Sequence, residues 1–519
     1  MRAIRAGALF LIIGVGPVAS ETADGPLSAI DWLSQSVAAP AGGDTGGLAM
    51  AINEPPVAGQ GSALPDPVLT TSLDAPSPDA VGLIAPAVSG LPADLWGAGL
   101  TRDIAMRLTA SHAGDLPALR QLFLTILLAE AKAPVDAGGR GELLQVRIDK
   151  LLALGALEQA AALIQAAGAG TPDLFRRAFD VALLTGAEDR ACVQMAETPD
   201  LAPTLPARIF CLARSGDWDT AALTLHTSEA LGQVSADQAS LLAGFLDPGL
   251  FDGAPPPHAP TPVTPLDWKI YEAIGEPLPT ESLPIAFSYA DLSPRAGWKA
   301  QIEAAERLTR AGTIPPNVIL GLYTERDPAA SGGVWDRVDA FQRFEAALAS
   351  GDTDRIAQTL PMVWARMQEA ELEVPFAVLF GKTLSQVPLE GEAAAIAYQV
   401  GLLSPSRDLV VRQHPSADQT DVFLAGLAAG DLTSLVAPNS LGRAIAEAFK
   451  TPVPSTEAQS FLDAARPGEA LLVAIDNIAR GVEGDLRGVT EGLSLLRLQG
   501  LEDVARRTAL ELMLLERRG

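Results

Sequence analysis

The sequence has few of the residues that carry catalytic, redox or metal chemistry. Its 519 residues include four histidines and two cysteines, and aromatic residues make up only 5%. No signature of a nucleophile, a zinc site or a redox centre surrounds them. Basic residues are also scarce, with 37 Lys and Arg against 63 Asp and Glu, so the chain lacks the basic surface that phosphate binding requires. The composition predicts no cofactor, no nucleic-acid partner and no enzymatic activity.

Long apolar runs are missing as well. The one notable run, residues 6–18, follows a short basic start and ends in small residues just before Glu21. This pattern is typical of a cleaved secretory signal, so we expect a signal peptide at 1–20. A retained N-terminal anchor is the alternative. Because no later segment reaches the length of a membrane span, we expect a periplasmic or secreted protein without a transmembrane segment in the mature chain.

Residues 38–90 have hardly any lysine or aromatic side chain and are rich in Pro, Gly, Ala, Ser and Asp. Such a segment buries too little apolar surface to offset the entropy of ordering, so the composition predicts a disordered linker. Before it, residues 21–37 contain an apolar island that includes Trp32 and Leu33. This island is either a docking peptide that folds on a partner or on its own domain, or a short helix without a partner.

Residues 91–246 show helical periodicity that is interrupted by regularly spaced glycines. Leucine, isoleucine and alanine recur at intervals of three and four, and Gly155, Gly186 and Gly216 fall about 30 residues apart. A glycine in the left-handed conformation commonly ends a helix. Thr171 before a proline and Ser235 are candidate helix caps. The pattern predicts stacked, TPR-like helical hairpins in a first array.

A Pro-rich and aromatic junction at 247–292 separates this array from a second one at 293–519. Turn glycines in the second array are spaced roughly 32 to 40 residues apart, which accommodates two helices and their loops. They are Gly312, Gly351, Gly391, Gly430, Gly468 and Gly500. The sequence therefore predicts an all-α fold, an α-solenoid of stacked helical hairpins in two arrays. An irregular helical bundle is the alternative.

Two pairs of aspartates could be taken for metal ligands. Asp217 with Asp219, and Asp352 with Asp354, each follow a turn glycine and open a predicted helix. Aspartate is favoured at helix N-termini as a cap, so we interpret both pairs as caps rather than as a metal site. The four histidines lie in separate segments and show no ligand spacing.

The loop from Tyr323 to Trp335 is the most polar and specialised loop of the chain. Arg326 stands between two acids, and a turn of small residues follows. Such a loop could hold a carboxylate or a partner strand. The alternative is a self-contained loop in which Arg326 pairs locally. The candidate partner-binding residues are Trp32, Leu33, Thr324, Glu325, Arg326, Asp327 and Trp335.

The two cysteines, Cys192 and Cys211, are predicted to form a disulfide. They would lie at the same height on two antiparallel helices joined by a turn at 198–205. Antiparallel packed helices allow such side chains to reach bonding distance, and an extracytoplasmic compartment is oxidising. Two buried, reduced thiols are the alternative.

Several stretches resemble an uncharacterised family of secreted alphaproteobacterial helical-repeat proteins, over roughly residue 91 to the C-terminus. The stretches are Leu95-Trp96-Gly97, Leu116-Pro117-Ala118-Leu119-Arg120, Glu272-Ala273-Ile274-Gly275-Glu276-Pro277-Leu278-Pro279, Gly297-Trp298-Lys299-Ala300, Glu303-Ala304-Ala305-Glu306-Arg307 and Gly321-Leu322-Tyr323-Thr324-Glu325-Arg326. Some similar proteins carry an antifreeze-glycopeptide label, but no Thr ladder or Ala-Ala-Thr repeat supports ice binding here. Periplasmic motility proteins of the MotC kind are similarly secreted and helical, yet no motif matches residue by residue. The resemblance implies fold and compartment, and no catalytic residue.

These observations together predict a non-catalytic periplasmic scaffold. Stacked hairpins present extended surfaces, and the expected partners are periplasmic or envelope proteins, in cell-envelope or motility assembly. The alternative is a binder or processing enzyme for a cell-wall glycan or a small molecule, in which the helices position the substrate.

Overall fold

The computed structural model describes residues 77–168, 170–247, 249, 257–413 and 418–515. Over these residues the fold is all-helical, as predicted, and the only β-type pairing is an isolated parallel bridge between Ile84 and Ala129. No helix in this part of the chain is long and apolar enough to cross a membrane. The expected signal peptide (1–20) and docking peptide (21–37), with Trp32 and Leu33, lie outside the described residues.

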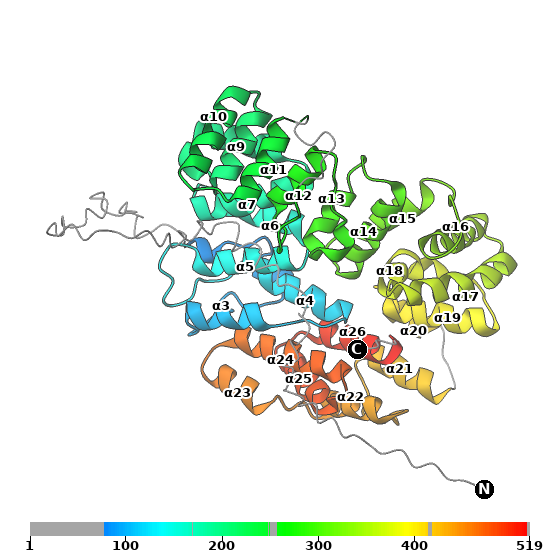
Figure 1. Ribbon diagram of the computed structural model, residues 1–519. Helices are drawn as coiled ribbons and strands as arrows, with labels where there is room; N and C mark the ends of the chain where they lie inside the picture. The colour runs from blue at the N-terminus through cyan, green and yellow to red at the C-terminus, as the bar shows by residue number, and fades with distance from the viewer. Residues whose placement is uncertain (1–76, 169, 248, 250–256, 414–417, 516–519) are drawn as a thin grey trace, which may run out of the picture.

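The helices pack mainly against their neighbours in the chain (Figure 1). In the first half they are α2 (Pro86–Ser89), α3 (Thr101–Ala110), α4 (Pro117–Leu128), α5 (Glu142–Ala153), α6 (Leu157–Ala167), α7 (Pro172–Thr185), α8 (Glu188–Glu197), α9 (Leu205–Arg214), α10 (Trp218–Ala230), α11 (Ala236–Leu246), α12 (Pro265–Ala273) and α13 (Ser288–Asp291). Short 3-10 helices are η1 (Pro78–Ala80), η2 (Pro199–Leu201), η4 (Thr280–Ser282) and η5 (Ile285–Phe287).

The second half continues in the same manner, with successive helices in contact. Its helices are α14 (Trp298–Arg310), α15 (Asn317–Thr324), α16 (Val334–Ser350), α17 (Thr353–Glu369), α18 (Glu373–Leu384), α19 (Gly391–Leu403), α20 (Arg407–Gln413), α21 (Gln419–Ala429), α22 (Ser440–Lys450), α23 (Thr456–Asp463), α24 (Pro467–Val482), α25 (Leu486–Leu498) and α26 (Glu502–Leu514).

The predicted turn glycines of the first array lie at helix ends. Gly155, Gly186 and Gly216 follow α5, α7 and α9 with positive φ angles of 75°, 76° and 86°, a conformation that costs glycine little. In the second array the expectation is wrong for two glycines. Gly391 is the first residue of α19, and Gly468 lies inside the first turn of α24. Gly468 is needed there for close packing, because a Cβ atom would lie 2.7 Å from the carbonyl oxygen of Leu95.

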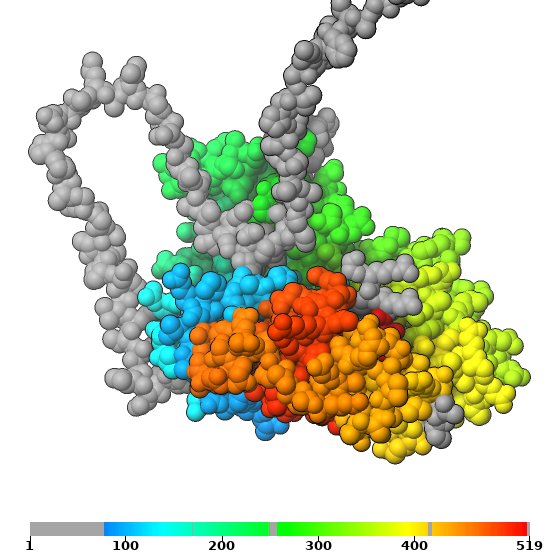
Figure 2. Space-filling view, turned by 90° about the horizontal axis from the view of Figure 1, so that it is seen from below, coloured from blue at the N-terminus to red at the C-terminus, as the bar shows by residue number. Residues whose placement is uncertain are grey.

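The two ends of the described chain lie side by side. In Figure 1, α3 and α4 lie directly above α24 and α26, and these helices are in contact. The space-filling view in Figure 2 shows the N-terminal and C-terminal segments sharing one face. A carboxylate oxygen of Glu511, in α26, accepts a hydrogen bond from the amide of Ala118 in α4 at 2.9 Å. The helical array is therefore closed by contacts between its ends.

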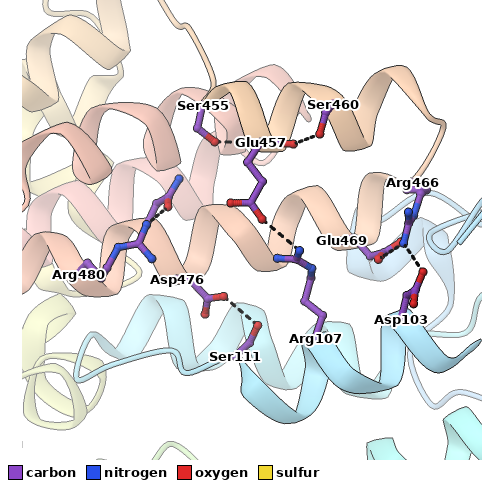
Figure 3. Close-up of polar contacts among 12 residues, drawn as sticks. Asp103, Arg107, Ser111, Ser455, Glu457, Ser460, Arg466, Glu469, Asp476 and Arg480 are labelled. Atoms are coloured by element: carbon purple, nitrogen blue, oxygen red, sulfur yellow. Dashed lines mark hydrogen bonds and ion pairs between the residues drawn. The ribbon is translucent and has the colours of Figure 1, made fainter. Parts of the chain in front are cut away.

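Polar side chains of α3 reach across to α23 and α24 at this closure (Figure 3). Arg107 pairs with Glu457 at 3.1 Å, and the Ser111 hydroxyl donates to Asp476 at 3.1 Å. Arg466 lies 3.4 Å from Asp103. These contacts fix the register of the two ends against each other.

The hydrophobic core also joins the two ends of the described chain. The larger cluster of buried side chains contains residues from Leu91 to Leu515 and so draws on both expected arrays. A smaller cluster, from Phe175 to Tyr271, lies within α7 to α12. In the junction segment, Trp268 belongs to the larger cluster and Tyr271 to the smaller one, so α12 connects the two.

The prediction of a disordered linker at 38–90 is wrong for its last part, because residues 77–90 are ordered. Asp79 in η1 is 1% exposed, and its carboxylate accepts a hydrogen bond from the amide of Leu144 at 2.8 Å. The carbonyl oxygen of Ile84 accepts from the amide of Glu130 at 2.9 Å. The segment is ordered because its polar groups bond to α5 and to the chain after α4, which the average composition does not reveal. Residues 38–76 lie outside the described residues.

The predicted disulfide is confirmed. Cys192 in α8 and Cys211 in α9 are bonded, with 5.0 Å between their Cα atoms, and both are 5% exposed. The two helices are antiparallel neighbours, connected through η2, and each cysteine lies near the middle of its helix. The two cysteines therefore lie at the same level along the two helix axes, as their spacing in the sequence predicted.

Loss of this bond should be measurable as lost stability. We expect the double variant Cys192→Ala, Cys211→Ala to lower the free energy of unfolding by about 3 kcal/mol, since the bond restricts the unfolded chain. Urea denaturation of the wild type under oxidising conditions, compared with the variant, measures the difference. Reduced wild-type protein should match the variant, and a difference below about 1 kcal/mol would contradict the expectation.

Candidate functional site

The predicted partner-binding loop connects α15 to α16 and is exposed along most of its length. Thr324, Glu325, Arg326 and Asp327 are all exposed, whereas Trp335 at the start of α16 is half-buried. The Thr324 hydroxyl donates to the carbonyl oxygen of Leu320, one turn back in α15. The structure thus places five of the seven candidate residues in one surface region, and the other two, Trp32 and Leu33, lie outside the described residues.

A buried polar cluster anchors both ends of this loop. The Tyr323 hydroxyl donates to Glu306 in α14 at 2.6 Å, and Arg337 in α16 donates to both carboxylate oxygens of Glu306 at 2.9 and 2.6 Å. Burial, and then the charge of Glu306, raise the pKa of Tyr323 well above its usual value. Burial is the largest single influence on Arg337 and lowers its pKa, but the hydrogen bonds and charge of Glu306, together with Tyr323, outweigh burial and raise the pKa. Both groups therefore stay protonated at neutral pH.

The exposed part of the loop is fixed on this base. Gln342 in α16 donates to the carbonyl oxygens of Tyr323 and Arg326, both at 2.7 Å. The Asp336 carboxylate accepts from the amide of Gly332 at 2.8 Å. Because α16 bonds to the backbone at three points, the loop has a defined conformation although its side chains face the solvent.

Arg326 pairs locally, as one of the two interpretations predicts. Its guanidinium lies 2.7 Å from Glu325 and 6.0 Å from the centre of the Trp298 ring. Trp298 in turn packs on Trp335, with 5.1 Å between the ring centres. The side chain of Arg326 is still 60% exposed, and Glu325 occupies only part of its five N–H donors. The remaining donors can bind a carboxylate. The half-buried Trp335 leaves some apolar surface nearby, whereas Trp298 is only 9% exposed.

In each aspartate pair that resembles a metal site, the first aspartate is a helix cap and the second lies in the first turn of the helix. The Asp217 carboxylate accepts from the amide of Thr220, and that of Asp352 accepts from the amides of Asp354 and Arg355. Within the described ranges, no group of three or more His, Cys, Asp or Glu side chains is arranged to hold a metal ion.

One feature that the sequence analysis missed is a polar pocket of about 730 Å³ between α6, α7, α8, α12 and α13. Glu188, Lys269 and Tyr289 line it. They come from three segments far apart in the sequence, and no short motif connects them. Charged side chains are rarely buried, so their burial marks these residues as unusual. A single sequence does not show which residues are buried, and it therefore contains no signal for this pocket.

Comparisons with protein-family models, with curated proteins and with solved structures find no match for this chain.

Proposed function

We propose that the protein is a non-catalytic periplasmic scaffold that binds envelope proteins. The observation that carries the proposal is the loop from Thr324 to Trp335, which presents polar side chains on a rigid, buried base. A preformed loop loses little conformational entropy on binding, and arginine beside tryptophan is a common energetic centre of protein interfaces. The partner group that fits Arg326 is a carboxylate flanked by an apolar side chain.

We also propose a cellular location and an arrangement of the helices. We infer that residues 1–20 are a cleaved signal peptide and that the mature chain works in the periplasm. The Cys192–Cys211 disulfide is compatible with an oxidising compartment. We further interpret the neighbouring helix pairs as two arrays of a TPR-like α-solenoid, whose outer surfaces supply the area for partners in envelope or motility assembly.

The loop can be tested by crosslinking inside cells. A photo-reactive amino acid at Asp327 should yield a specific adduct with an envelope protein, because Asp327 is exposed next to Arg326. The same amino acid at Asp339, in α16, serves as the control position and should not yield that adduct. Equal adducts from both positions would contradict a defined interface at the loop.

The partner found in this way allows a quantitative prediction. Arg326→Ala should weaken its binding at least about 10-fold, since truncation of a central interface arginine costs about 2 kcal/mol. Arg343→Ala is the matched control, because Arg343 is 61% exposed and also pairs locally, with Asp339 at 2.9 Å. Calorimetry or biolayer interferometry measures both. Wild-type affinity of Arg326→Ala would place the partner surface elsewhere on the protein.

A further inference from the structure

The polar pocket between α7, α8, α12 and α13 has a composition suited to a ligand. Trp268 and Tyr289 are among its lining residues, and its volume of about 730 Å³ is within the range of small-molecule sites. None of the residues of the candidate loop lines it. Its charged lining residues are Glu158, Glu188, Asp189, Arg214, Lys269, Glu272 and Arg295.

Glu188 is the most deeply buried of these charges, with a side chain that is only 6% exposed. One of its oxygens lies 3.3 Å from Lys269 and 3.4 Å from Arg214. The other oxygen, Oε2, is buried and has no hydrogen-bond partner among the described residues. A buried carboxylate oxygen without a donor is costly, so the site has an acceptor to offer.

Four acids line the pocket against three bases. Two of the bases, Lys269 and Arg214, already pair with Glu188, and the third, Arg295, is exposed. Lys269 also pairs with Glu272 at 2.9 Å, and Arg214 also pairs with Asp189. Two cations therefore serve three carboxylates. Glu158 forms no ion pair within the described part of the chain, and the whole protein carries a charge of −26. A ligand that donates hydrogen bonds to Glu188 and carries positive charge fits this excess of acids.

A second hollow lies beside this pocket and shares two of its lining residues. Asp189 and Arg214 also line this hollow of about 490 Å³, together with Val193 and Glu197. The ion pair thus lies between two adjoining hollows, and the second one adds a further acid.

We propose that this pocket binds an organic cation through a primary ammonium group. The ammonium group donates to the Glu188 carboxylate, next to Trp268 and Tyr289. A free polyamine and a lysine side chain of a peptide share this chemistry. The site is separate from the loop and does not depend on the scaffold proposal.

Calorimetry on the full mature chain tests the proposal with two probes, spermidine and the blocked tripeptide acetyl-Ala-Lys-Ala-amide. Saturable one-to-one binding of either probe supports it. Binding of spermidine alone identifies a free polyamine as the source, and binding of the tripeptide identifies a lysine side chain. Absence of binding for both probes up to about 10 mM, a concentration well above typical specific dissociation constants, would overturn the proposal.

Charge-removing variants locate the binding. Glu188→Gln should weaken binding at least about 10-fold, because the hydrogen bonds to a charged acceptor are lost. Glu272→Gln should weaken binding about 3-fold. The Glu272 side chain is 35% exposed, so this substitution should be tolerated by the fold. It therefore still tests the site if Glu188→Gln does not fold. Glu229→Gln, on the exposed side of α10, removes the same charge outside the pocket. Equal weakening by Glu229→Gln and Glu272→Gln would show attraction to the overall charge and overturn the site.

Discussion

Replacement of Arg147 by leucine is expected to lower the free energy of unfolding by about 3–5 kcal/mol, the range for breaking a buried polar network. Arg147 in α5 is 1% exposed. Its guanidinium donates to the carbonyl oxygens of Asp79, Val81, Leu127 and Ala129. Burial lowers the pKa of Arg147 to about 10, so the group remains charged at neutral pH. Leucine fills the space but leaves these carbonyl oxygens without their donor.

Urea denaturation followed by circular dichroism measures this loss. Arg140→Leu is the control, because Arg140 is exposed in the loop before α5, and it should change stability by less than about 0.5 kcal/mol. The Arg147 variant should also become sensitive to protease within residues 77–90, since this arginine holds that segment. A loss below about 1 kcal/mol, or continued protection of the segment, would contradict the role assigned to Arg147.

A second large effect is expected from pH, through Asp180 in α7. Burial raises the pKa of Asp180 to about 7, although the Arg176 guanidinium is 3.8 Å away and opposes the shift. The folded form then binds a proton more tightly than the unfolded form does. The stabilising contribution is complete below the unfolded pKa, near 4, and is lost as the pH rises toward 7. About three pKa units correspond to at most about 4 kcal/mol.

Asp180→Asn isolates this contribution, because asparagine has no charge to bury. The variant should gain stability relative to the wild type between pH 4 and pH 8, and the gain should level off above pH 7. Asp219→Asn, at an exposed position in α10, removes the same charge and should show no such trend. Denaturation midpoints at a series of pH values give the comparison. Parallel curves for the wild type and Asp180→Asn would show that Asp180 is ionised throughout.

Much of the local structure could be predicted from the sequence. Caps such as Thr171, whose hydroxyl accepts from the amide of Leu174, follow directly from residue type and spacing. The same holds for the Cys192–Cys211 bond, since matched heights on two antiparallel helices depend only on local geometry. The ordered segment 77–90 was missed, although Ser77-Pro78-Asp79 has the same form as the cap at Thr171. Its order depends on Arg147, which lies more than 60 positions away.

Contacts between distant helices could not be predicted. Glu306, Tyr323 and Arg337 form the base of the candidate loop, yet the sequence shows only that a polar loop follows an apolar helix. The ion pair between Glu188 and Lys269 could not be predicted either, because the two residues are about 80 positions apart and meet only when α12 packs against α7. Periodicity shows which face of a helix is apolar, but it does not identify the helix that covers it.

The closure of the array has a consequence for the order in which the chain can fold. Arg466 and Asp103 are 363 positions apart, so the last helices reach α3 only when nearly the whole chain has been made. Because the chain is made from its N-terminus, α3 and α4 are available before α24 is. During this time the apolar face that α26 later covers has no native partner. Completion of the C-terminal helices is therefore the step that finishes the fold, and the N-terminal helices are the part most in need of protection before it.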